Sequence, residues 1–131
     1  MKRLTTVGLQ ILLSLAFLAS AILKLAGAAD AMREHLEIAQ WFWVLTALVE
    51  IVGAAGMLVG ITFPRLAAPA GLWIAALMGG ALVAHLRVGD SFMSMVPATV
   101  YLVLALAVAT LHAGDYGFRE ARDAVRTGGR K

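Results

Sequence analysis

The sequence contains no cysteine, and charged residues make up only 15% of its 131 positions. Without cysteine the chain has no disulfide, thiolate metal site or thiol relay of its own. Any redox role therefore depends on a bound cofactor. The formal net charge is only +3, and most basic residues lie near the two ends of the chain. This distribution is typical of membrane orientation signals and argues against nucleic-acid binding.

Hydrophobic residues make up 61% of the chain, whereas a soluble domain carries roughly 45–50%. They form four continuous stretches of about 20 residues, the length that crosses a hydrocarbon core of about 30 Å. The stretches cover about residues 7–26, 41–61, 68–88 and 93–111. Their continuous apolar character excludes a β-barrel, whose strands alternate. We predict an all-α fold, a membrane four-helix bundle over residues 1–113, followed by a cationic tail over residues 114–131.

Two segments outside the spans have helical patterns. Residues 30–40 predict a short amphipathic helix on the outer surface, with Met32, Leu36 and Ala39 on one stripe. The tail after residue 114 predicts a separate short helix, and its arginines suit an anionic lipid surface.

The flanking charges predict the orientation of the bundle. With four spans, both termini lie on one side of the membrane. That side carries Lys2, Arg3, Arg65, Arg119, Arg122, Arg126, Arg130 and Lys131, and the other side carries Arg33 and Arg87. The positive-inside rule makes the first side cytoplasmic, so we expect a multi-pass protein of the cell (inner) membrane. Trp41 and Trp43 are expected at the outer interface, and Trp73 at the inner one.

Three residues are costly where they stand, because a charge at the bilayer centre costs about 2.5–3.5 kcal/mol. Glu50 lies near the middle of the second span, Lys24 near the outer end of the first, and His85 near the outer end of the third. At about 1.5 Å per residue, Lys24 and His85 lie roughly 4–6 Å inside the outer boundary and Glu50 roughly 13 Å inside it. We therefore predict that Glu50 contacts Lys24 or His85, and that the three form a ligand-binding site.

Each of these residues also has a structural reading. Glu50 can be a protonated acid that bonds a neighbouring helix, Lys24 can extend its ammonium to the interface, and His85 can join two helices. No metal site is predicted, since the histidines lie in different layers and no carboxylate is spaced to join them. No catalytic serine arrangement is visible either, and the serines and threonines within the spans are expected to bond their own helix.

Three ordered motifs resemble the DoxX-like family over roughly residues 8 to 112. They are Ala21-Ile22-Leu23-Lys24-Leu25, Val49-Glu50-Ile51-Val52-Gly53 and Ala84-His85-Leu86-Arg87-Val88-Gly89-Asp90. The resemblance implies the four-span fold. It also implies an association with membrane redox complexes, because the wider family includes subunits linked to thiosulfate:quinone oxidoreductases and terminal quinol oxidases. A cofactor of the chain's own is not expected, and a bound quinone is the expected redox partner.

Three functions follow as hypotheses. The first is a redox-associated or accessory membrane protein that binds a small amphiphile, such as a quinone or a lipid head group, in a polar pocket open toward the outer side. The second is a small proton-coupled multidrug-type transporter that uses Glu50. The third is a purely structural or assembly role, in which the polar residues fix helix register. Membrane lipids are the expected surroundings, while turnover and the choice between a homo-oligomer and a partner subunit are left open.

Overall fold

A computed structural model describes residues 2–128, with side chains for residues 3–114 and 125. Its helices are α1 (Lys2–Leu25), α2 (Asp30–His35), α3 (Gln40–Thr62), the 3₁₀ turn η1 (Pro64–Leu66), α4 (Ala67–Arg87) and α5 (Phe92–Gly128). Within the described residues there is no strand. Four helices are long and apolar enough to cross a membrane, over residues 3–25, 40–62, 64–87 and 92–114. The predicted all-α membrane bundle and its four spans are confirmed.

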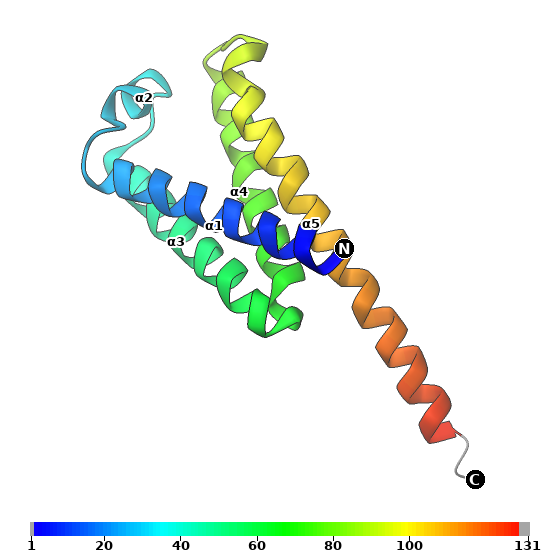
Figure 1. The fold of residues 1–131 in the computed structure, drawn as a ribbon. Helices are drawn as coiled ribbons and strands as arrows, with labels where there is room; N and C mark the ends of the chain where they lie inside the picture. The colour runs from blue at the N-terminus through cyan, green and yellow to red at the C-terminus, as the bar shows by residue number, and fades with distance from the viewer. Residues whose placement is uncertain (1, 129–131) are drawn as a thin grey trace.

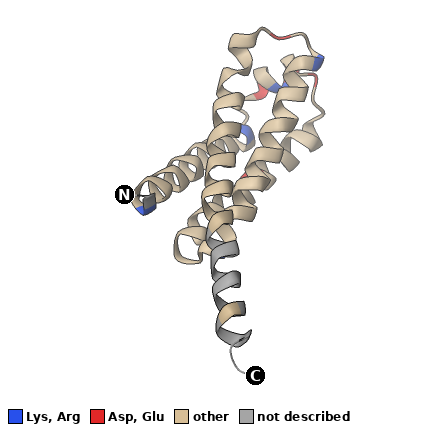
Figure 2. Ribbon diagram, turned by 90° about the vertical axis from the view of Figure 1, so that its right-hand side faces the viewer, with Lys and Arg blue, Asp and Glu red and all other residues tan. Residues whose placement is uncertain are grey.

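The long helices associate as two pairs. The helix α1 packs along α3, the helix α4 packs along α5, and the two pairs meet through contacts between α3 and α4. In Figure 1 the α1–α3 pair crosses the α4–α5 pair obliquely, and α2 and the α4–α5 turn lie toward the same end of the molecule. Figure 2 shows the described charged residues mostly near helix ends and loops, with long uncharged stretches between them.

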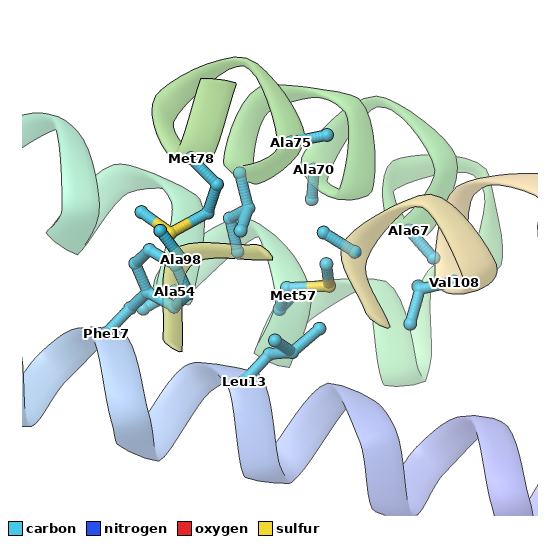
Figure 3. Close-up of a cluster of buried hydrophobic side chains, with 12 residues drawn as sticks. Leu13, Phe17, Ala54, Met57, Ala67, Ala70, Ala75, Met78, Ala98 and Val108 are labelled. Atoms are coloured by element: carbon cyan, nitrogen blue, oxygen red, sulfur yellow. The ribbon is translucent and has the colours of Figure 1, made fainter. Parts of the chain in front are cut away.

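The core contains many small side chains and a few large ones. Its buried members are Leu13, Phe17, Ala54, Met57, Ala67, Ala70, Ile74, Ala75, Met78, Ala98, Ala105 and Val108, of which Figure 3 labels ten. The Phe17 ring meets the edge of the Tyr101 ring at 5.7 Å between centroids. Alanine and glycine allow helix backbones to approach closely, which is how membrane helices gain packing energy when lipid removes the hydrophobic drive.

Buried polar side chains join α1 to α3. The Gln10 amide donates to the carbonyl of Met57 at 3.2 Å, and the Ser14 hydroxyl contacts the carbonyls of Gln10 at 2.7 Å and Ala54 at 3.2 Å. The expected bond from Ser14 to its own helix is therefore present, and the hydroxyl also reaches the neighbouring helix. Such bonds contribute about 0.6 kcal/mol on average in membrane proteins.

Close contacts between helices depend on glycine at particular positions. A Cβ added to Gly60 would lie 3.0 Å from the Ala67 backbone, and one added to Gly56 would lie 3.1 Å from the Ala70 Cβ. The small-xxx-small pattern of Gly56 and Gly60 thus lets α3 approach the start of α4 closely. The tightest contact is at Gly71, where an added Cβ would lie 2.8 Å from the Ala105 carbonyl oxygen.

Gly71→Ala is expected to lower the free energy of unfolding by about 1–3 kcal/mol, because the new methyl group forces α4 away from α5. Gly79→Ala is the matched control, since a Cβ at Gly79 meets nothing within 4 Å. It should be neutral or stabilising by up to about 1 kcal/mol, the helix preference of alanine over glycine. Reversible unfolding in detergent micelles measures both. Equal effects of the two substitutions would contradict this packing.

Two sequence expectations differ from the structure. The outer helix ends at His35 instead of continuing to residue 40, because Glu37 adopts a left-handed backbone with φ 52°. Of the predicted stripe, Leu36 is buried, while Met32 and Ala39 are exposed. The tail is not a separate helix, since α5 continues without a break from Phe92 to Gly128. Most tail side chains lie outside the described residues.

Candidate functional site

A buried ion pair joins α1 to α3. Lys24 lies in the last turn of α1, and its Nζ lies 2.6 Å from Oε1 of Glu50, in the middle of α3. The side chains of Lys24 and Glu50 are only 12% and 5% exposed. The predicted contact between Glu50 and Lys24 is confirmed. The lysine reaches inward to the carboxylate, so its ammonium does not extend to the membrane interface.

Two further side chains of α3 surround the ammonium. Nζ of Lys24 lies 4.5 Å from the centroid of the Trp43 ring and 3.5 Å from the Thr46 hydroxyl oxygen. Trp43, Thr46 and Glu50 follow one another at helical spacing, which places them on one face of α3. Trp43 is 3% exposed, so the expectation that it marks the outer interface is wrong. Its ring faces a cation inside the bundle, whereas the neighbouring Trp41 is 70% exposed.

The ion pair lies in the wall of a cavity of about 390 Å³, which we call the outer cavity. Its lining consists of Lys24, Leu36, Ile38, Phe42, Trp43, Thr46, Val49, Glu50, Trp73, Ala76, Leu77, Met78, Gly80, Ala81 and Ala84. Most of these side chains are apolar, so the cavity has one polar region, at the ion pair, beside a larger apolar region. Phe42 and Trp73 are about half exposed, which places an opening on the flank formed by α3 and α4.

Trp73 also differs from its predicted place at the inner interface. Its indole N–H donates to the carbonyl of Val49 at 3.0 Å, and Val49 precedes Glu50 in the middle of α3. The ring therefore lines the outer cavity instead of marking a membrane boundary.

His85 belongs to a second polar cluster, and it does not line the outer cavity. Its Nδ1 lies 2.5 Å from one carboxylate oxygen of Asp90, and Nε2 of His35 lies 2.6 Å from the other. A carboxylate only accepts, so both imidazole nitrogens are donors. Of the three residues expected to meet, the structure brings Lys24 and Glu50 together. His85 instead helps Asp90 to join the end of α4 to α2.

The hydrogen bonds from His85 and His35 hold the pKa of Asp90 below its usual value, because they stabilise the ionised carboxylate. From the sequence, Asp90 is named only as the end of the third motif and has no predicted role in the site. Its role depends on the path of the loop between α2 and α3, which the sequence spacing does not specify. The available signal is that Asp90 follows His85 by five positions, directly after the end of the third span.

Backbone contacts also fasten this loop over the outer cavity. The Arg87 guanidinium donates to the carbonyls of Leu36 at 2.5 Å and Glu37 at 3.2 Å, and Arg33 donates to the carbonyl of Ile38 at 3.3 Å. Leu36 and Ile38 line the cavity, and Leu36 is only 4% exposed. The loop therefore covers the end of the cavity nearest α2, and Asp90 and Arg87 attach it to α4.

Asp90→Asn is expected to loosen the segment of residues 30–38. The amide has only one accepting oxygen and no negative charge, so it cannot accept hydrogen bonds from both imidazole rings as the carboxylate does. Hydrogen–deuterium exchange of this segment should become several-fold faster. Glu34→Gln is the control, because Glu34 is a carboxylate of the same segment that does not contact Asp90.

The pH dependence of this effect has a definite sign. The folded pKa of Asp90 is lowered, so its carboxylate stabilises the fold above the ordinary carboxyl pKa, and this contribution is lost as the pH falls through the lowered folded pKa. The difference in melting temperature between wild type and Asp90→Asn should be constant at neutral pH and shrink below about pH 4. A difference that is equal at every pH would contradict the assignment.

A second cavity of about 510 Å³ lies at the opposite end of the bundle, between the start of α1, the end of α3 and residues 111–112 of α5. It is lined by Arg3, Thr6, Val7, Gln10, Gly60, Ile61, Thr62, Pro64, Leu111 and His112. The imidazole of His112 donates through Nδ1 to the carbonyl of Val108 at 2.9 Å. Among the described residues, no group of three or more His, Cys, Asp or Glu is arranged to hold a metal ion.

Four apolar helices with polar side chains buried between them define a small multi-pass membrane protein. The chain belongs to the DoxX-like family, whose sequence model matches residues 8–108. It is also similar to the uncharacterized protein YdgD of Bacillus subtilis (strain 168), with 32% identity over 75 residues. That match covers 56% of this chain and 66% of the relative. No solved structure gives a significant match.

Proposed function

We propose that this protein binds a small amphiphile in the outer cavity and acts as an accessory subunit of a membrane redox system. The observation that carries the proposal is the buried Lys24–Glu50 pair in the wall of an otherwise apolar cavity. A cavity with a polar region beside a larger apolar region is complementary to a molecule with a polar head and an apolar tail. The volume of about 390 Å³ lies within the usual range of small-molecule sites, about 300–1,000 Å³.

The proposed roles follow from hydrogen-bonding chemistry. Lys24 donates to an oxygen of the ligand, and Glu50 orients the ammonium through the 2.6 Å contact. His85 acts indirectly, because its bond to Asp90 helps to hold the covering loop. The exposed rings of Phe42 and Trp73 support an entrance on the lipid-facing flank, through which a ligand dissolved in the membrane would enter from the side. A quinone or a lipid is the proposed class of occupant.

The ion pair argues against a cation exporter. A drug cation would have to displace the ammonium that already neutralises Glu50. The structural alternative, in which the pair only fixes helix register, predicts no ligand. Native mass spectrometry of protein extracted from the membrane, with identification of co-purified small molecules, tests the proposal. Purified protein that carries no lipid-soluble molecule other than bulk lipid would contradict the proposal.

We also propose that both termini lie in the cytoplasm, on the basis of the flanking basic residues. Because the chain has no cysteine, single cysteines can report this directly. Glu34→Cys is expected to react with a membrane-impermeant thiol reagent added outside the cell, and Arg65→Cys only after the membrane is opened. Both positions are exposed. The reverse pattern of labelling would overturn the orientation.

A further inference from the structure

Two side chains that line the outer cavity each carry a buried polar atom with no hydrogen-bond partner among the described residues. These atoms are Oε2 of Glu50 and Nε1 of Trp43. A buried polar atom without a partner costs about 1–3 kcal/mol, and most such atoms in native proteins are paired. The two atoms are complementary in kind, because a carboxylate oxygen only accepts and an indole N–H only donates.

Both atoms belong to side chains that contact the same ammonium group. Nζ of Lys24 lies 2.6 Å from the other oxygen of Glu50 and 4.5 Å from the centre of the Trp43 ring. Both side chains also line the outer cavity. The unused acceptor and the unused donor therefore belong to two side chains that meet at one ammonium group and line the same cavity.

The charge of the site limits what can bind beside them. Lys24 and Glu50 cancel each other, and no further charged side chain among the described residues lines the cavity. A charged ligand would bring an uncompensated charge into a mostly apolar space, which is costly. The matching ligand is neutral.

We infer that the outer cavity recognises a neutral amphiphile whose head is a hydroxyl group, either aliphatic, as in a lipid alcohol, or phenolic, as in a quinol. The inference rests on the proposed function, because it names the ligand class of the same cavity. A hydroxyl donates one hydrogen and accepts through two lone pairs, so it donates to Oε2 of Glu50 and accepts from Nε1 of Trp43. An ether or a quinone carbonyl only accepts, and it leaves the carboxylate oxygen without a partner. The site therefore favours a quinol over the corresponding quinone.

Matched pairs of probes test this inference. The purified full chain is placed in an amine-oxide detergent, which carries no hydroxyl group, and its melting temperature is followed as each probe is titrated. Dodecanol and its methyl ether form the aliphatic pair, and para-nonylphenol and its methyl ether form the phenolic pair. In each pair the tail is identical and only the hydroxyl hydrogen is replaced. The stronger pair identifies the source of the natural hydroxyl.

Wild type is expected to bind at least one hydroxyl probe about tenfold more tightly than its ether, the effect of one lost buried hydrogen bond. Trp43→Phe keeps a ring over Lys24 but removes the N–H, so hydroxyl binding should weaken about three- to tenfold. Trp41→Phe is the control, because Trp41 does not line the outer cavity.

The other outcomes separate the two proposals. If each ether binds as tightly as its hydroxyl partner, the hydroxyl inference is overturned and amphiphile binding stands. If no probe stabilises the protein, both proposals are overturned. If the preference for hydroxyl is unchanged in Trp43→Phe, the hydroxyl does not bond to Nε1 of Trp43, and that assignment is overturned.

Discussion

Lys24→Met is expected to lower the free energy of unfolding by about 3–5 kcal/mol, the usual cost of leaving one partner of a buried ion pair alone. Methionine replaces the stem of lysine but leaves the carboxylate of Glu50, which is 5% exposed, without a compensating charge. Glu50→Gln should cost less, about 1–3 kcal/mol. The amide oxygen can still accept from Lys24, and if that bond is lost the ammonium, in the last turn of α1, can extend toward the interface.

The double variant makes this prediction specific. Lys24→Met combined with Glu50→Gln should be more stable than Lys24→Met alone, because the stranded charge is gone. Unfolding of all four proteins in mixed micelles gives the coupling energy of the pair. Simple addition of the two single losses would mean that the two groups do not interact in the folded protein.

Gly80→Leu is expected to remove most of the co-purified ligand without weakening the ion pair. Gly80 lines the outer cavity, and an added Cβ meets no atom within 4 Å, so the larger side chain fills ligand space instead of breaking the fold. Ligand content should fall about tenfold, which corresponds to a loss of roughly 1.4 kcal/mol in binding. Glu50→Gln should also lower it, because the charge that orients Lys24 is lost.

Two controls separate binding from stability in this experiment. Gly79→Leu adds the same side chain one position away, outside the cavity lining. Gly71→Ala lowers stability at the α4–α5 contact, and Gly71 does not line the cavity. Both should keep their ligand when it is quantified by mass spectrometry after extraction. If ligand content follows melting temperature across all variants, or does not change at all, the structural role of the pair is favoured.

The spans and the ion pair could be predicted because their cause is local in the sequence. A charged residue within an apolar helix is costly wherever the helix packs, so Glu50 and Lys24 required partners, and helical rise places them at depths that meet. The sequence predicts a separate tail helix after residue 114, but α5 continues through Gly114 and Gly117. A glycine within a helix costs only about 1 kcal/mol, which does not end it.

The rest of the site could not be predicted because it depends on tertiary contacts. Tryptophan is common at membrane interfaces, and nothing in the local sequence distinguishes the buried Trp43 from the exposed Trp41. Likewise, Asp90 bonds both His85 and His35, and His35 is 55 positions away in the sequence. Their meeting depends on the loop after α2, in which Glu37 has a left-handed backbone conformation.

The pairing of neighbouring helices has a consequence for how the protein is made. The helix α1 packs on α3, the next long helix in the chain, and α4 packs on α5. Each pair is a helical hairpin that can enter the bilayer as a unit while synthesis proceeds from the N-terminus. Both members of the ion pair, Lys24 and Glu50, belong to the first hairpin. Their charges can neutralise each other during insertion, before the second hairpin leaves the ribosome.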